Sequence, residues 1–422
     1  MIQTLRNAWK IPELRKKLMF TALVLLLYRI GNVIPVPFIN VEVLTSYFNS
    51  VLSETILGLY NAMSGSAFSQ GTVLALSIQP YINASIIIQL LTVAIPALER
   101  MAKEEGEAGK KKLTMITRIA TVFLGLIMGW GFYSLMAANG VLSRTGFLPG
   151  MVVVLTFTAG SAVVMWLGEQ LHEYGIGNGI SMILFANIIS SLPAGLNTML
   201  HMGWWAILVA IVMAALVLFI IFVNDAERRI PIQYAKRGVG RKIYGGQNTN
   251  LPIKVSMTGV MPGVMPVIFA QSIASLPATI CAFIGVNDGW WYKNVFDSSS
   301  WIYAVCYFLL IFFFSWFYAS IQYDPVEISN NLKKNGGFIP GFRPGKPTAD
   351  FIKKVINKIV VFGAVYLGIV ALLPIVAGNL LPDIKNLAIG GTSVIIVVSV
   401  ALETVKALEA QMLMRHYKGF LD

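Results

Sequence analysis

Charge is scarce in this chain. Only 12% of its 422 residues are Asp, Glu, Lys or Arg, whereas about a quarter of the residues are charged in an ordinary soluble protein. Hydrophobic residues make up 56%, and the mean hydropathy is +0.71. Domains of ordinary size cannot bury so much apolar surface. The composition therefore excludes cytosolic enzymes, secreted disulfide scaffolds and disordered chains, and it indicates a protein whose solvent is the lipid bilayer.

Cysteine and histidine are also rare. The chain has two cysteines, Cys281 and Cys306, and three histidines, so the sequence predicts no disulfide framework, metal site or other cofactor. The apolar segments hold almost no ionisable residues, and Arg29 and Glu169 stand near predicted helix ends, where long side chains reach the interface. Since no nucleophile and base are grouped in the sequence, we expect no enzyme active site.

Long apolar runs are what the chain has in abundance. They are continuous and of helical length, whereas strands of a membrane β-barrel are short and alternating, so we predict an all-α membrane protein with ten transmembrane helices. The ten runs cover residues 18–36, 72–96, 113–138, 149–171, 180–199, 203–224, 258–284, 299–321, 357–379 and 388–411.

Lysine and arginine are distributed unevenly between the connecting loops. Of the 32 such residues, 28 fall in residues 1–17, 97–118, 225–254, 322–358 and after 405. Because positively charged loops stay on the cytoplasmic side, this pattern predicts a multi-pass protein with both termini in the cytoplasm. The loops at 225–254 and 322–356 are too long and too basic to be simple connectors, so we interpret them as docking surfaces for acidic or RNA-bearing partners.

Ten helices divide into two halves of five, and because five is odd, any repeat between the halves is inverted. The second span of each half is interrupted, in the first half by Gly65 and Gly71, with Pro80 inside the resumed helix, and in the second half within 262–266. Matching breaks of this kind indicate a central pathway.

From the residues alone, a secondary transporter of small solutes, or a membrane insertase without a continuous pore, remains an alternative to a channel. The predicted regions are a cytoplasmic amphipathic segment 1–17, a first half 18–200, a second half 201–411 and a cytoplasmic tail 412–422.

Six segments spread along the chain resemble the SecY family, the channel subunits of the bacterial Sec protein-export translocon. The longest is Leu76 to Gln89, and the resemblance covers essentially the whole chain in order. The others are Trp166 to Gln170 continuing through Gly175 to Ser181, Tyr28 to Pro35, Tyr234 to Arg237, Pro340 to Gly345 and Gly390 to Ser393.

The resemblance implies two pseudosymmetric halves around a central hourglass channel in the bacterial plasma membrane. Such a channel is not an enzyme: it passively conducts unfolded secretory polypeptides and releases transmembrane segments sideways into lipid. The implied partners are the SecE and SecG subunits, the SecA motor ATPase, the ribosome, signal peptides, nascent polypeptides and the lipid bilayer.

Two closing elements of the channel are implied by the same resemblance. A plug covers about residues 55–70, and a ring of aliphatic side chains narrows the pore. Plug residues are Met63, Ser64, Gly65 and Phe68. Ring residues are Ile78, Ile82, Ile180, Leu184, Ile268 and Ile396.

The resemblance also implies a lateral gate and a docking surface. Polar residues on the gate helices are Gln89, Gln271 and Ser272. Basic residues that meet the SecA motor or the ribosome are Arg228, Arg229, Lys236, Arg237, Arg241, Lys242 and Arg343.

Overall fold

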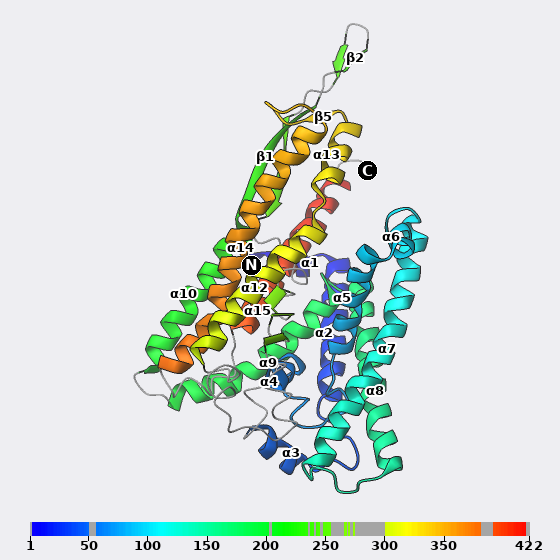
Figure 1. Cartoon of the computed structure of the whole chain (residues 1–422), viewed down its shortest axis with the longest axis vertical. Coiled ribbons are helices and arrows are strands. Elements are labelled where there is room, and N and C mark those ends of the chain that lie inside the picture. Colours follow the sequence, from blue (N-terminus) through cyan, green and yellow to red (C-terminus); the bar gives the residue numbers. More distant parts are fainter. Residues whose placement is uncertain are drawn as a thin grey trace. The chain divides into compact units, whose positions relative to one another are not determined.

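The computed structural model describes residues 2–49, 56–201, 205–234, 237–239, 242–244, 248–254, 266–267, 269–270, 273–274, 300–380 and 391–418 (Figure 1). The chain divides into two compact units. Unit 1 is formed by Met1–His201 together with Leu387–Ile389 and Val400–Asp422, and unit 2 by Met202–Asn386 together with Gly390–Ser399.

The named elements of unit 1, among its described residues, are all helices. Prolines stand in the first turn of several of its helices, where their missing N–H group costs nothing, and the Asn40 side chain accepts a hydrogen bond from the Val43 N–H at the start of α3. The helices are α1 (Ile2–Lys10), α2 (Pro12–Gly31), α3 (Val41–Tyr47), α4 (Ile56–Ser64), α5 (Gln79–Ala94), α6 (Pro96–Lys103), α7 (Gly106–Ala138), α8 (Phe147–Tyr174) and α9 (Gly179–His201).

Two long helices, α7 and α8, lie side by side in unit 1 (Figure 1). Gly125 and Gly129 of α7 face α8, because a Cβ at Gly125 would lie 3.3 Å from the Thr158 Cγ2, and one at Gly129 would lie 3.4 Å from the Val154 carbonyl oxygen. Small residues spaced four apart let the backbones of membrane helices approach closely. The pair is therefore packed through a glycine face.

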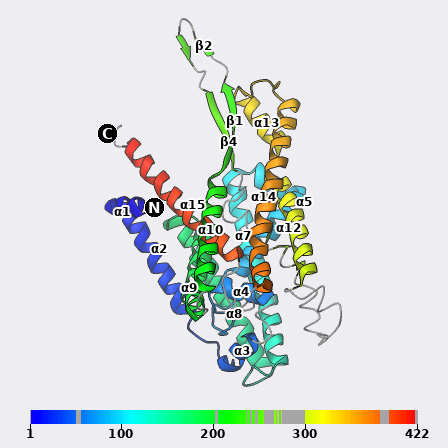
Figure 2. The same ribbon diagram turned by 90° about the vertical axis from the view of Figure 1, so that its left-hand side faces the viewer.

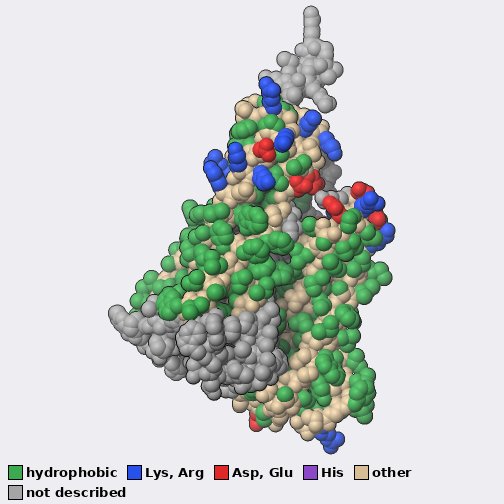
Figure 3. Space-filling view, viewed as in Figure 1, with side chains coloured by type: hydrophobic (Ala, Val, Ile, Leu, Met, Phe, Trp, Pro, Cys, Tyr) green, Lys and Arg blue, Asp and Glu red, His purple; other side chains and the backbone are tan. Residues whose placement is uncertain are grey.

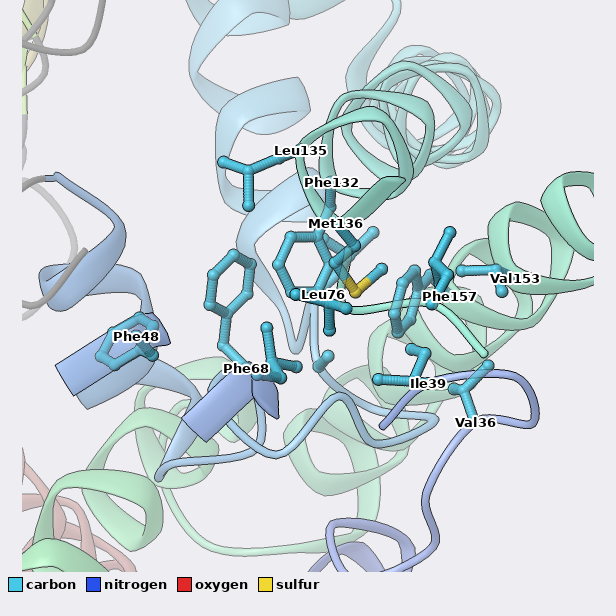
Figure 4. Close-up of a cluster of buried hydrophobic side chains, with 14 residues drawn as sticks. Val36, Ile39, Phe48, Phe68, Leu76, Phe132, Leu135, Met136, Val153 and Phe157 are labelled. Carbon is cyan, nitrogen blue, oxygen red and sulfur yellow. The ribbon is translucent and has the colours of Figure 1, made fainter. Parts of the chain in front are cut away.

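An aromatic and aliphatic core holds the segment after α4 against α7 and α8 (Figure 4). Phe68 stacks on Phe132 with ring centroids 4.0 Å apart, and Phe132 in turn contacts Phe157 at 5.3 Å. All three side chains are buried. Burial of large aromatic side chains dominates such cores, so Phe68 anchors its segment to the helices of unit 1.

Unit 2 combines long apolar helices with a small antiparallel sheet. Strand β1 pairs with β4 on one edge and with β5 on the other, and β1 and β4 run together toward the separate β2–β3 hairpin (Figure 2). The elements are α10 (Trp205–Asp225), β1 (Glu227–Tyr234), β2 (Arg237–Val239), β3 (Lys242–Tyr244), β4 (Asn248–Lys254), α12 (Trp301–Gln322), α13 (Pro325–Lys334), β5 (Gly337–Phe338) and α14 (Lys346–Leu380); the last helix, α15 (Gly391–Lys418), begins in unit 2 and ends in unit 1.

Five helices of the described residues are long and apolar enough to cross a membrane, and α5 with α6 forms a sixth candidate that is bent by 107°. The expected predominance of apolar helices is thus present, and the number of ten spans stays a prediction. The span expected at 258–284 lies largely outside the described residues. The first expected span began at residue 18, whereas α2 begins at Pro12 and ends at Gly31.

Two other expectations differ from the structure. The second span was expected to begin at residue 72, but α5 begins at Gln79, with Pro80 in its first turn, because the backbone before Gln79 is not helical. The basic segment at 225–254 was expected to be a loop, but it forms β1 to β4. Ile230 and Ile232 alternate with exposed residues along β1 and pack on a core that includes Leu332 and Ile352, and this alternation makes the segment a strand.

Candidate functional site

The predicted plug consists of helix α4 and the start of the break that follows it. Helix α4 ends at Ser64, and α5 begins only at Gln79, so the interruption expected from Gly65 and Gly71 is present. Positive φ angles occur at Gly65 (66°), Ser66 (69°), Gly71 (58°) and Ser77 (47°), a conformation that ends helices and reverses the chain. We call residues 56–70 the plug segment.

Four predicted plug residues contact their surroundings in different ways. Met63 and Ser64 are buried, with 1% of each exposed, and the Met63 sulfur accepts a hydrogen bond from the Gln79 amide at 3.0 Å. The Ser64 hydroxyl accepts from the Phe68 N–H at 3.1 Å. Gly65 lies at the turn after α4, and Phe68 joins the aromatic core. The plug segment is therefore an integral part of unit 1.

Polar side chains of α2 and α9 meet the end of α4. The amide of Asn187 donates to the Met63 carbonyl at 2.7 Å and to the Tyr28 hydroxyl at 2.8 Å. The Tyr28 hydroxyl is also hydrogen-bonded to the Ser77 hydroxyl at 2.9 Å. Asn187 and Tyr28 were not among the predicted site residues, although an asparagine within an apolar helix is a recognisable signal because unpaired polar groups are costly there.

Arg29 corrects another expectation. It was interpreted as a side chain that reaches the membrane interface, but its Nη1 atom is buried beside the turn at Gly65. Glu169, interpreted in the same way, forms an ion pair with Arg118 across α7 and α8, with 2.9 Å between the Arg118 Nε and the carboxylate. Both charges of this pair are partly exposed, so its contribution to stability is small.

The aliphatic residues of the predicted ring can be placed in part. Ile78, Ile82 and Leu184 are buried in unit 1, and Ile180 is half-buried. Ile78 and Ile180 come together over Gly168 of α8, since a Cβ on that glycine would lie 3.2 Å from the Ile78 Cδ1 and 3.5 Å from the Ile180 Cγ1. Ile396 is buried on α15 of unit 2, and Ile268 lies outside the described residues.

Only one of the predicted gate residues is described. Gln89 is half-buried near the end of α5, and its carbonyl accepts a hydrogen bond from the Thr92 hydroxyl at 2.6 Å. Gln271 and Ser272 lie outside the described residues.

The basic docking residues are carried by the sheet of unit 2 and the turn after it. Arg228 and Arg229 are exposed on β1, and Arg343 is exposed between β5 and α14. Since β1 pairs with β5, through Gln233 opposite Phe338, the sheet joins the two basic segments. Lys and Arg side chains gather at this end of unit 2 (Figure 3). Arg237 and Lys242 lie in the β2–β3 hairpin, and Lys236 and Arg241 lie outside the described residues.

The described residues offer no candidate metal-binding site. Among the residues that the structure describes, no three His, Cys, Asp or Glu side chains are grouped to hold a metal ion. Cys306 is an exposed free thiol on α12, and Cys281 lies outside the described residues.

Known proteins resemble this chain over its full length. The protein translocase subunit SecY of Streptomyces scabiei is 43% identical over 444 residues, covering 100% of each chain. Two solved structures share the fold, each covering 94% of this chain and 92% of the other with a TM-score of 0.64. One is described as the structure of a protein conducting channel, at 20% identity, and the other, at 19%, concerns the plug domain of the SecY protein, which stabilises the closed state of the translocation channel.

The full-length identity to a protein translocase subunit, together with the apolar helices, defines the chain as a membrane subunit of a protein translocase, and the solved structures show that it has the fold of a channel. The family profile of SecY matches residues 72–405, and the chain belongs to the SecY family.

Proposed function

We propose that this chain forms the channel through which unfolded secretory polypeptides cross the bacterial plasma membrane and from which transmembrane segments pass sideways into lipid. The observation that carries the proposal is the 43% identity to a protein translocase subunit across the full length of both chains. The scarcity of charge in the predicted spans supports it, because an ion-coupled transporter of small solutes needs ionisable groups at the membrane midplane.

The pore is closed at two levels in this proposal. The aliphatic ring that the family resemblance implies consists of Ile78, Ile82, Ile180, Leu184, Ile268 and Ile396. Branched aliphatic side chains exclude water and ions without binding a passing peptide. The plug segment closes the pore on its outer side, which its burial in unit 1 supports.

Lateral release uses the helices that carry Gln89, Gln271 and Ser272. Polar contacts between membrane helices contribute on the order of 1 kcal/mol each, so an apolar signal peptide that binds between the helices can shift the gate to its open state.

Docking of the driving partner uses the basic end of unit 2. The SecA motor and the ribosome are both expected partners there, since acidic protein surfaces and RNA phosphates attract Arg and Lys by the same Coulomb interaction. SecE and SecG are the expected companion subunits. The Lys and Arg distribution supports cytoplasmic termini on the same side as this surface.

Photo-crosslinking tests the proposed pore. A probe at Ile82, which is 1% exposed, is expected to crosslink to a secretory precursor stalled in the translocon. Leu155 on α8 is the control, because it is 51% exposed on the surface of unit 1 and is expected to face lipid. A precursor that is engaged but crosslinks at neither position, or at both equally, contradicts the assignment of Ile82 to the pore.

A further inference from the structure

Two side-chain amides cap the last turn of the plug helix α4. Asn187 of α9 donates to the Met63 carbonyl at 2.7 Å, and Asn32, which follows α2, donates to the Ser64 carbonyl at 3.2 Å. These carbonyls belong to the final turn of a helix, where the helix itself supplies no donor. The hydrogen bonds therefore connect the end of the plug helix to two elements that are distant in sequence.

Tyr28 holds the Asn187 amide in its capping orientation. Both side chains are fully buried, and the Tyr28 hydroxyl accepts from the Asn187 amide at 2.8 Å while bonding to the Ser77 hydroxyl at 2.9 Å. Buried hydrogen-bond networks of this kind fix the orientation of their members. A change at Tyr28 is thus expected to act on the plug through Asn187.

Arg29 places a positive charge at the same end of α4. A Cβ on Gly65 would lie 2.7 Å from the Arg29 Nη1 and 3.1 Å from the Asn187 Oδ1, so both groups border the plug turn. The C-terminal end of a helix carries a partial negative charge that a cation stabilises. Among the described residues, the Arg29 Nη1, the Asn32 Oδ1 and the Asn187 Oδ1 are buried without a hydrogen-bond partner.

We propose that Tyr28, Arg29, Asn32 and Asn187 form a polar seat that holds the plug helix closed by capping its C-terminal end. The inference rests on the proposed role of α4 as a plug. Buried polar atoms without partners destabilise a structure, and departure of the plug would let water reach the three unpaired atoms of the seat. The seat therefore favours the closed state through a few hydrogen bonds. When an entering polypeptide displaces the plug, these bonds are lost, but hydration of the three unpaired atoms offsets part of that loss.

Ion leak through the complete translocon complex in planar bilayers tests the seat. Tyr28→Phe removes one hydroxyl and is expected to raise the leak about fivefold, the factor by which one hydrogen bond of typical strength shifts an equilibrium. Asn187→Leu removes the capping amide and is expected to raise it further. The matched control is Tyr133→Phe, which also loses one hydroxyl hydrogen bond, but one made to the Gly146 carbonyl rather than to a residue of the polar seat.

Two Arg29 variants separate an effect of the positive charge from a purely structural effect on the ion leak. Arg29→Lys keeps the positive charge and is expected to leak less than Arg29→Gln, while the thermal midpoints of the two variant complexes stay similar. Equal leak from these two variants contradicts a contribution from the charge.

The seat is overturned if Tyr28→Phe and Asn187→Leu leak like the wild type, or if Tyr133→Phe leaks as much as they do. Export of a secretory precursor by the wild-type complex is measured in parallel. Its failure would contradict the proposed function, whereas the leak comparison independently reports whether these residues keep the pore closed.

Discussion

At the scale of single residues, Gly65 shows how the absence of a side chain shapes the plug turn. Its φ angle is +66°, and an added Cβ would lie 2.7 Å from the Arg29 Nη1 and 2.9 Å from the Ser190 hydroxyl. A non-glycine residue in this conformation costs about 1–2 kcal/mol before any crowding is considered. Gly65 therefore satisfies two requirements that no other residue type meets together.

Gly65→Ala is expected to displace the plug turn and raise the ion leak of the translocon complex. Gly140→Ala is the control, because Gly140 has nearly the same φ angle, +67°, with nothing within 4 Å of an added Cβ. The strain of a positive φ is thus present in both variants, and the crowding at Arg29 in only one. Similar leak from both would show that crowding at the plug turn has no part in closure.

The sequence indicates some residues around the plug segment and not others for definite physical reasons. The assignment of Ile78 and Ile82 to the ring comes from the family strings and stays a prediction, and both side chains are buried in unit 1. Asn187 was missed because its partner Tyr28 lies 159 positions away, and no local pattern reveals such a pair. Arg29 was misinterpreted because it stands near a helix end in the sequence. Nothing in the sequence around it indicates that the turn at Gly65 buries its Nη1 atom.

At the scale of elements, α7 and α8 depend on the glycine face of α7. Gly129→Leu is expected to force the helices apart and destabilise the protein by about 1–3 kcal/mol, because extra volume in a packed interface strains its surroundings. The measurement is the thermal midpoint of the purified complex in detergent. Gly131→Leu, at a position with nothing within 4 Å of an added Cβ, is expected to leave that midpoint unlowered. Equal destabilisation by both would contradict close packing at Gly129.

Helices were easier to predict than strands because a membrane-spanning helix leaves a longer signal in the sequence. A membrane span needs about 20 apolar residues in succession, and such runs stand out in α7, α8, α10, α12 and α14. Strand β1 carries Arg228, Arg229 and Pro231 among its buried isoleucines, so its alternation is short and is masked by charge. Its pairing with β5 joins positions about a hundred residues apart, which no local signal indicates.

At the scale of the whole molecule, positive charge and apolar surface are separated along the chain. Of 32 Lys and Arg residues, 28 fall in five segments that the positive-inside rule assigns to the cytoplasm. In unit 2 the sheet unites two of these segments, so Arg228 and Arg343 belong to one small folded module with its own hydrophobic core. Such a module offers a partner a fixed basic surface, and its charge attracts acidic partners over a range that salt shortens.

Reversing the charge at Arg343 tests whether this surface couples the channel to its driving partner. Arg343 is exposed, and its backbone carbonyl, rather than its side chain, accepts the hydrogen bond from the Thr348 hydroxyl. Arg343→Glu is therefore expected to leave folding and membrane insertion of the protein intact while abolishing motor-driven export, measured with membrane vesicles and a purified secretory precursor. Arg144→Glu makes the same change in net charge at an exposed loop residue predicted to face the other side of the membrane, and it is expected to export normally. Normal export by Arg343→Glu would remove Arg343 from the docking surface, and equal loss in both variants would show that net charge, rather than this site, controls export.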